Sequence, residues 1–242
     1  MILSYLMSGD FTAAIINFFV LAFIVFAINP IHEFAHAFAA YKLGDNTAKN
    51  AGRLTLNPLA SFDLFGTLMF LFVGIGWAKP VPINPRNFKG SQKAGTVITA
   101  AAGPLSNLIV ALISAFISGA VYRFSGLNST TTNIVFAFLL LMNINIILAA
   151  FNLIPLPPLD GSRIAAGLLP DRIYFKLFRY DGLIRNGLMG FMLLSMILRS
   201  FGIDLFYPIR WVEGFIGFGF TKLAGHVFGV NLDIIYQKFF RL

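Results

Sequence analysis

Long runs of hydrophobic residues, separated by short polar and basic segments, dominate this chain. The first run begins at about Phe11, passes Ile28 and continues to Tyr41. A helix of that length rises about 1.5 Å per residue, so it would measure about 45 Å and exceed a hydrocarbon core of about 30 Å. Further runs long enough to span a bilayer lie at about residues 96–122, 134–153 and 187–206. The pattern therefore predicts four transmembrane helices.

Two signals interrupt the first run. Asn29-Pro30 lies near its end, and a proline removes one backbone donor, so we expect an interruption of the helix there. Gly44 is a plausible helix stop. The polar stretch after it contains residues 53–58, which alternate like a short strand ended by a turn. An exposed strand there could hold an extended peptide by strand addition.

Residues 64–77 form a shorter hydrophobic run that contains Gly66, Gly74 and Gly76. Basic residues flank it on both sides, whereas a spanning helix would place its two flanks on opposite sides of the membrane. We therefore expect a re-entrant element, which needs protein or a watery cavity around its backbone. The predicted fold is an all-α polytopic membrane protein, a multi-helix bundle with a broken, re-entrant or β-like membrane-associated element.

Composition supports a membrane setting and excludes several functions. The chain is 57% hydrophobic and 12% charged, about half the charged fraction of soluble domains. Its net charge of +8 comes from basic residues at the ends of hydrophobic runs, which fits orientation in a bilayer and not nucleic-acid binding. Cysteine is absent, so thiol catalysis is excluded. We expect one membrane domain over residues 1–242, with core motifs at 11–170 and a tail at 208–242 that is a fifth span or an interfacial helix.

The sequence His32-Glu33-Phe34-Ala35-His36 carries the candidate chemistry. Residues four apart share one face of a helix, so both imidazoles can bind one Zn²⁺ ion. Glu33 can then take a proton from the water bound to the metal. A pair of interfacial histidines without a metal is the alternative interpretation of this spacing.

Charge counting places the N-terminus outside and the end of the first span on the cytoplasmic side. The end of the third span returns to that side, and it is followed by Pro-Leu-Asp160-Gly. A catalytic zinc site takes three protein ligands and leaves one position open, so Asp160 is the predicted third ligand. Asp-Gly is also a common turn pair, which would give Asp160 a purely structural role.

Two other classes of function use the same three side chains. A membrane metal-ion carrier could use them as a transit site, although that gives no reason for Glu33. A scaffold with a structural zinc would need a fourth protein ligand, and only three residues have suitable spacing. A metal-dependent hydrolase explains all four residues.

Four ordered motifs together resemble those of the site-2 proteases, which are zinc-dependent intramembrane metalloproteases. They are His-Glu-x-x-His at 32–36, Trp-Ala-Lys-Pro-Val-Pro at 77–82, Gly-Pro-Leu-Ser-Asn at 103–107 and the segment at 152–161. The resemblance extends to about Pro170 and is to the small form without PDZ or CBS domains. It implies cleavage of peptide bonds in or near transmembrane segments of membrane-protein substrates, in the cell membrane, with the active site towards the cytoplasm.

The resemblance also implies roles for single residues. It makes His32, His36 and Asp160 the zinc ligands and Glu33 the catalytic acid and base. It suggests that Asn152 holds substrate or polarises the scissile carbonyl, and it places Asn107 in the substrate-binding region. From the residues alone, a buried amide can equally hydrogen-bond a neighbouring helix, so a structural role for Asn107 is an equal alternative.

Overall fold

The computed structural model describes residues 9–73, 78–126, 128–170 and 207–240, together with single positions and short stretches between 182 and 198. The described elements are helices, and no strand occurs among them. The chain divides into two compact units. The first contains Met1–Ile24, Asn107–Ala150 and Tyr207–Leu242, and the second contains Val25–Ser106 and Phe151–Phe206. The protein is thus an all-α membrane protein in the part of the chain that is described.

The first hydrophobic run is helical throughout but irregular in its middle. Helix α2 (Phe11–Phe23) begins where the Asp10 carboxylate accepts the amide hydrogen of Ala13, at 2.9 Å. A π-helical turn, η1 (Ile24–Ile28), follows, and α3 (Asn29–Lys42) carries Pro30 in its first turn. The expected interruption is therefore a widened turn before Pro30, whose ring cannot fit the regular hydrogen-bond ladder.

Helix α3 ends as the sequence indicated. Gly44 adopts a φ of +106°, a left-handed conformation that favours glycine over other residues. A side chain at Gly44 would also lie 3.2 Å from the Asn87 carbonyl oxygen. The two short helices α4 (Thr47–Asn50) and α5 (Pro58–Ser61) then pack against α3, and α6 (Leu64–Val73) follows.

The predicted short strand at residues 53–58 is wrong. Residues 53–57 contain a bend and irregular backbone, and Pro58 begins α5. Asn57 explains the change, because its side chain accepts the Leu59 amide hydrogen at 3.0 Å and so caps a helix. Residues 53–58 have no strand to pair with among the described residues. The capping hydrogen bond at Asn57 therefore decides the local conformation. Strand addition at this segment therefore has no structural basis.

Two long helices form much of the remaining chain. Helix α7 (Gln92–Ser125) contains Pro104, which cannot donate a hydrogen bond to the Ala100 carbonyl. Helix α8 (Ser129–Asn152) begins at Asn128, whose side chain accepts the Thr131 amide hydrogen at 2.9 Å. The short helix α9 (Asp160–Leu168) follows α8 after a proline-rich segment. Helix α7 extends the predicted second span at both ends, whereas α8 begins five residues before the predicted third span and ends one residue before it does.

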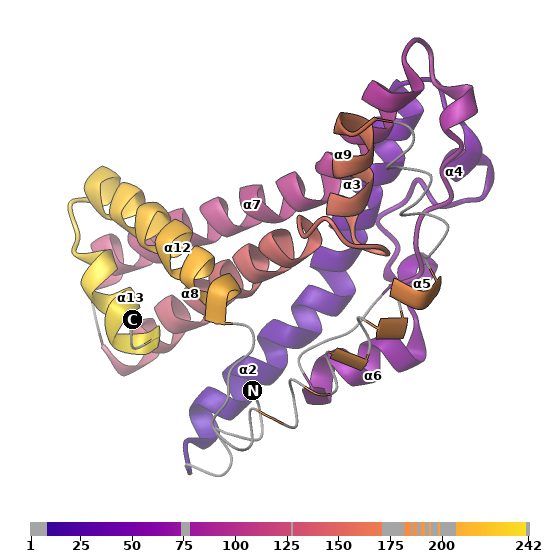
Figure 1. Cartoon of the computed structure of the whole chain (residues 1–242). Coiled ribbons are helices and arrows are strands. Elements are labelled where there is room, and N and C mark those ends of the chain that lie inside the picture. Colours follow the sequence, from indigo (N-terminus) through magenta and orange to yellow (C-terminus); the bar gives the residue numbers. More distant parts are fainter. Residues whose placement is uncertain are drawn as a thin grey trace. The chain divides into compact units, whose positions relative to one another are not determined.

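The tail is helical and belongs to the first compact unit. Helices α12 (Tyr207–Phe228) and α13 (Leu232–Phe240) pack on parts of α7 and α8 within that unit (Figure 1). Their shared hydrophobic core consists of Ala111, Ala115, Val135, Leu139, Met142, Ile146, Ala224, Leu232 and Tyr236. Tyr236 is fully buried, and its hydroxyl donates a hydrogen bond of 2.7 Å to the Asn143 side-chain oxygen.

Three of the described helical segments are long and apolar enough to cross a membrane: Phe11–Lys42, Gln92–Ser125 and Ser129–Asn152. They correspond to the first three predicted spans. Most of the fourth, at about 187–206, lies outside the described residues, as do residues 74–77 of the predicted re-entrant element. Within that element the described part is the ten-residue helix α6.

We expect Tyr236→Phe to lower the free energy of unfolding by about 1–2 kcal/mol, because it leaves the buried Asn143 oxygen without its donor. Thermal unfolding of the purified protein would measure the change. Tyr122→Phe is the matched control, since Tyr122 packs half-buried against the same core and its hydroxyl has no hydrogen-bond partner among the described residues. Equal stability of wild type and Tyr236→Phe would contradict this role of the hydroxyl.

Candidate metal centre

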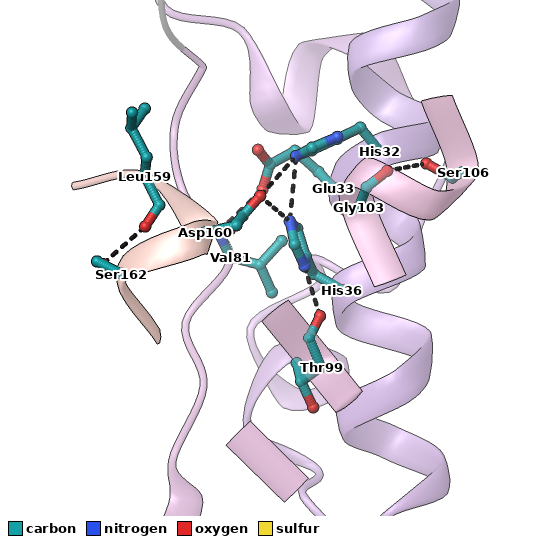
Figure 2. Close-up of polar contacts among 10 residues, drawn as sticks. All are labelled: His32, Glu33, His36, Val81, Thr99, Gly103, Ser106, Leu159, Asp160 and Ser162. Carbon is teal, nitrogen blue, oxygen red and sulfur yellow. Dashed lines mark hydrogen bonds and ion pairs between the residues drawn. The ribbon is translucent and has the colours of Figure 1, made fainter. Parts of the chain in front are cut away.

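Two imidazoles lie side by side on α3. His32 and His36 are 9% and 6% exposed, and their Nε2 atoms are 3.1 Å apart. The four-residue spacing places both side chains on one face of the helix, as Figure 2 shows. Two buried ring nitrogens at this distance need either a shared proton or a shared cation between them.

The orientation of His36 is fixed by a backbone carbonyl. Its Nδ1 lies 2.7 Å from the Thr99 carbonyl oxygen on α7. A carbonyl can only accept, so Nδ1 must carry the proton and donate it. In neutral His36 the other nitrogen, Nε2, then presents a lone pair towards His32, which is the form of histidine that binds a metal.

Asp160 completes the cluster from a segment far along the chain. It is the first residue of α9, and its Oδ2 atom lies 3.4 Å from His32 Nε2 and 3.2 Å from His36 Nε2. The next residue, Gly161, makes this entry to the helix possible, because a side chain there would overlap the Leu153 carbonyl group. The three ligand atoms all lie within 4.8 Å of one another.

The triangle of atoms has the size of one face of a tetrahedral zinc site. Its edges are 3.1, 3.2 and 3.4 Å. Two ligands at about 2.0–2.1 Å from zinc, separated by the tetrahedral angle, lie about 3.3 Å apart. Two imidazoles and one carboxylate also leave the fourth position open, which is the arrangement of catalytic zinc sites.

The protons available within the cluster do not satisfy its acceptors. In neutral His36 the Nε2 atom carries a lone pair, and the buried Asp160 Oδ2 accepts no well-aligned hydrogen bond from the described residues. Burial by itself would raise the pKa of the Asp160 carboxyl, but its interactions with His32 and His36 outweigh burial and lower that pKa below its ordinary value. An ionised carboxylate beside two imidazole nitrogens suits a cation, and the residues present fit a metal ion.

Gly103 on α7 provides the space for the two rings. A Cβ atom at this position would overlap the His36 imidazole and would lie 2.6 Å from Cε1 of His32. Any other residue would therefore displace the two rings. The close approach of α7 to α3 explains why the motif at 103–107 begins with glycine.

Glu33 lies half-buried beside the cluster, on the same helix as the two histidines (Figure 2). Its Oε2 atom accepts a hydrogen bond of 3.2 Å from the Val81 amide. Val81 is buried and belongs to residues 78–82, the described part of the predicted motif at 77–82; Trp77 lies outside the described residues. The bond leaves the second carboxylate oxygen, Oε1, for a water molecule or substrate.

The two asparagines predicted to act on substrate are not members of the three-residue cluster. Asn107 is 2% exposed within α7 and belongs to the first compact unit, whereas the cluster belongs to the second. Asn152 is half-buried and is the last residue of α8. Their roles stay predictions.

The match to a protein-family model agrees with this geometry. The model for peptidase family M50 matches residues 18–194, which is most of the chain and includes all three ligand candidates. The chain belongs to peptidase family M50. The protein is therefore a peptidase by family and a metallopeptidase by the chemistry of its cluster. No solved structure matches the chain.

Two curated bacterial proteins are similar to this chain. "Putative zinc metalloprotease YwhC" of Bacillus subtilis (strain 168) is 46% identical over 149 residues, which cover 61% of this chain and 68% of that protein. "Putative zinc metalloprotease Rip2" of Mycolicibacterium smegmatis (strain ATCC 700084 / mc(2)155) is 32% identical over 144 residues, covering 54% of this chain and 50% of that protein. The matched region thus spans about two thirds of the first relative and half of the second.

Sequence reasoning missed the contacts made by backbone atoms. The Thr99 carbonyl and the Val81 amide orient His36 and Glu33, and neither depends on the identity of its own side chain. Val81 lies in the motif at 77–82, and Thr99 lies shortly before the motif at 103–107. The sequence indicated both motifs but did not indicate which contacts they make. Those motifs were therefore the only signal that could have indicated them.

We expect Gly103→Ala to lower the affinity for zinc by on the order of 100-fold, because the new methyl group displaces both imidazoles. Alanine is the better helix former by about 1 kcal/mol, so loss of helix stability would not be the cause. Zinc content after dialysis against a graded chelator would measure the effect.

Gly95→Ala provides the matched control on the same helix. Its methyl group would meet the Phe88 ring, with 2.9 Å to Cε2, and no imidazole. It should keep the affinity of wild type for zinc even if stability falls. If Gly103→Ala binds zinc as tightly as Gly95→Ala, the rings do not depend on the space at Gly103.

Proposed function

We propose that this protein is an intramembrane zinc metalloprotease that hydrolyses peptide bonds in or near transmembrane segments of membrane-protein substrates. His32, His36 and Asp160 hold the zinc ion, and Glu33 is the general base and acid. The observation that carries the proposal is the buried triangle of two Nε2 atoms and one Oδ2 atom, with edges of 3.1–3.4 Å and a carboxylate beside it. The names of the two relatives, both zinc metalloproteases, support the choice of metal.

The chemistry divides between the ion and Glu33. A bound zinc ion supplies a Lewis acid that lowers the pKa of a coordinated water and polarises the scissile carbonyl. Glu33 takes the proton of the attacking water on its free oxygen, Oε1, as the new carbon–oxygen bond forms. Glu33 then delivers this proton to the leaving amide nitrogen as the carbon–nitrogen bond breaks. The Val81 amide holds Oε2 during both transfers.

Asn152 and Asn107 are proposed to contact the substrate. A side-chain amide can donate a hydrogen bond to a carbonyl oxygen that gains negative charge. Asn152 is half-buried eight residues before Asp160, at the end of α8, which makes it the stronger candidate of the two.

A site on the cytoplasmic side is supported by the charges near the metal ligands. Lys42 and Lys49 are exposed shortly after His36, where α3 ends and α4 follows. Basic residues concentrate on the cytoplasmic flanks of membrane helices. His36 lies less than two turns before the end of α3, so water from that side has a short path to the metal.

The substrate class follows from the setting. The candidate ligands lie on or next to helices long enough to span a bilayer, so a substrate must approach through or along the membrane. A membrane helix has its own amides satisfied, and its backbone must unwind before a carbonyl can reach the metal. We therefore propose membrane-protein substrates that expose a locally unwound segment.

We expect Glu33→Gln to retain zinc and to lose about 10²–10⁴-fold in cleavage rate, because the amide keeps the shape of glutamate but cannot accept the proton. Wild type and the variant would be expressed in the same host membranes, and membrane-protein fragments would be compared by mass spectrometry, with zinc measured on both purified proteins. Fragments present only with wild type identify reaction and substrate together.

Glu213→Gln is the matched control, since Glu213 is the other glutamate of the chain and lies in α12 of the first compact unit. It should produce the same fragments as wild type. Identical fragments from wild type and Glu33→Gln would reject the hydrolase. Zinc transport that survives in Glu33→Gln, without any wild-type-specific fragment, would instead support a metal carrier.

A further inference from the structure

A second buried carboxylate, Asp45, lies outside the metal cluster and has no role in the chemistry above. It is 0% exposed and lies between α3 and α4. Its Oδ2 atom accepts the Asn84 amide hydrogen at 2.7 Å. Its Oδ1 atom accepts three donors: the Thr47 amide at 3.0 Å, the Thr47 hydroxyl at 2.5 Å and the Asn87 side-chain amide at 2.8 Å.

These bonds keep Asp45 in its charged form. Burial alone would raise the pKa of the carboxyl, but the hydrogen bonds from Thr47, Asn84 and Asn87 outweigh burial and hold that pKa below its ordinary value. Charge-assisted hydrogen bonds are roughly twice as strong as neutral ones. Asp45 therefore joins the end of α3 to residues 84–87 through strong hydrogen bonds.

The same segment carries the amide that binds Glu33. Val81 lies three residues before Asn84, and it donates to Glu33 Oε2 at 3.2 Å (Figure 2). Pro80 and Pro82 flank Val81, so the chain on both sides is stiff and extended. A displacement at Asn84 is therefore transmitted to Val81 and not absorbed between them.

A second connection fixes the other side of Val81. The Arg53 guanidinium donates a hydrogen bond of 2.6 Å to the Lys79 carbonyl oxygen, and the Lys79 amide donates to the Ser61 carbonyl at 3.0 Å. Val81 thus lies between two fixed points, at Lys79 and Asn84. All of these residues belong to the second compact unit.

We propose that Asp45 is a positioning residue for catalysis: it fixes the segment 78–87 so that the Val81 amide holds Glu33 in the orientation required for proton transfer. Asp45 acts through Val81 and touches neither the metal ligands nor the substrate. The inference rests on the proposed function, since it requires Glu33 to be the general base. It predicts that loss of Asp45 impairs the proton-transfer step and leaves metal binding intact.

Asp45→Asn is the variant that tests the proposal. It keeps the shape of the side chain but replaces one acceptor oxygen by a donor. The side chain at position 45 can then no longer accept hydrogen bonds both from the Asn84 amide and from Thr47 and Asn87. We expect kcat on fluorescein-labelled casein, an unfolded probe substrate, to fall roughly tenfold or more, because small misplacements of catalytic groups are costly. We expect KM and zinc content to remain those of wild type.

Thr47→Val is the matched control. It removes a donor to the same carboxylate and the acceptor of a 3.2 Å hydrogen bond from the Asn87 side chain, but it leaves the bond between Asp45 and the Asn84 amide in place. If the hydrogen bonds of Asp45 between α3 and α4 contribute only to the stability of the fold, both variants should lose kcat in parallel. The proposal requires that Thr47→Val keep the kcat of wild type.

Hydrogen exchange provides a readout that needs no substrate. Residues 79–84 contain only four backbone amides, because positions 80 and 82 are proline. Asp45→Asn should speed the exchange of these amides, whereas Thr47→Val should not. Unchanged exchange in Asp45→Asn would overturn the proposal whether or not casein is cleaved.

A double-variant cycle tests whether Asp45 acts through Val81. Val81→Pro removes the donor to Glu33, and Val81→Ala controls for the lost packing of this buried side chain. If the effect passes through the amide, Asp45→Asn should lower kcat no further in the presence of Val81→Pro. Additive losses would contradict the proposed route.

Two further variants keep every outcome informative. Should Asp45→Asn fail to fold, Arg53→Gln removes the other fixed point and must give the same pattern of lower kcat, retained zinc and faster exchange; wild-type behaviour of Arg53→Gln would then reject the proposal. Glu33→Gln separates the two hypotheses. If it is inactive while Asp45→Asn has the kcat of wild type, the positioning role fails and the proposed function stands.

Discussion

The second compact unit depends on two imidazole nitrogens and one carboxylate oxygen that are buried within 3.1–3.4 Å of one another. The carbonyl of Thr99 fixes one proton of His36 on Nδ1, so in the neutral ring Nε2 faces the Asp160 carboxylate with a lone pair. Such an arrangement is repulsive when buried unless a cation lies between the atoms. The second compact unit is therefore ordered around a cluster that can hold a metal ion, and the distances between the candidate ligand atoms match the size of zinc coordination.

Backbone groups and the absence of a side chain define the surroundings of that site. A carbonyl orients one histidine, an amide holds the carboxylate of Glu33, and the missing side chain of Gly103 leaves room for both rings. The helix that carries the histidines is itself irregular, with a π-helical turn just before Pro30. Irregular backbone is costly within a membrane and persists where neighbouring protein groups satisfy it.

The segment 78–87 connects the polar end of α3 to Glu33 on the same helix. Asp45 and Arg53 bind it at two points, and Val81 contacts Glu33 between them. Prolines make this segment stiff, so few ordered residues suffice to fix the carboxylate of Glu33. The same prolines remove backbone donors from the segment, which makes it a poor template for strand pairing.

The sequence by itself determined the helical membrane fold, the three described spans, the end of α3 at Gly44 and the pair of histidines with Glu33, because these depend on local periodicity and on fixed spacing within one helix. It indicated Asp160 through charge counting along the chain. It misjudged residues 53–57, because alternation of residue types predicts a strand only when a pairing partner exists, and Asn57 instead caps a helix. Only the tertiary structure decided the role of Gly103, the partners of His36 and Glu33 and the connection through Asp45. Those contacts join residues 39–71 positions apart through backbone atoms, which every residue type provides alike and which no sequence pattern therefore distinguishes.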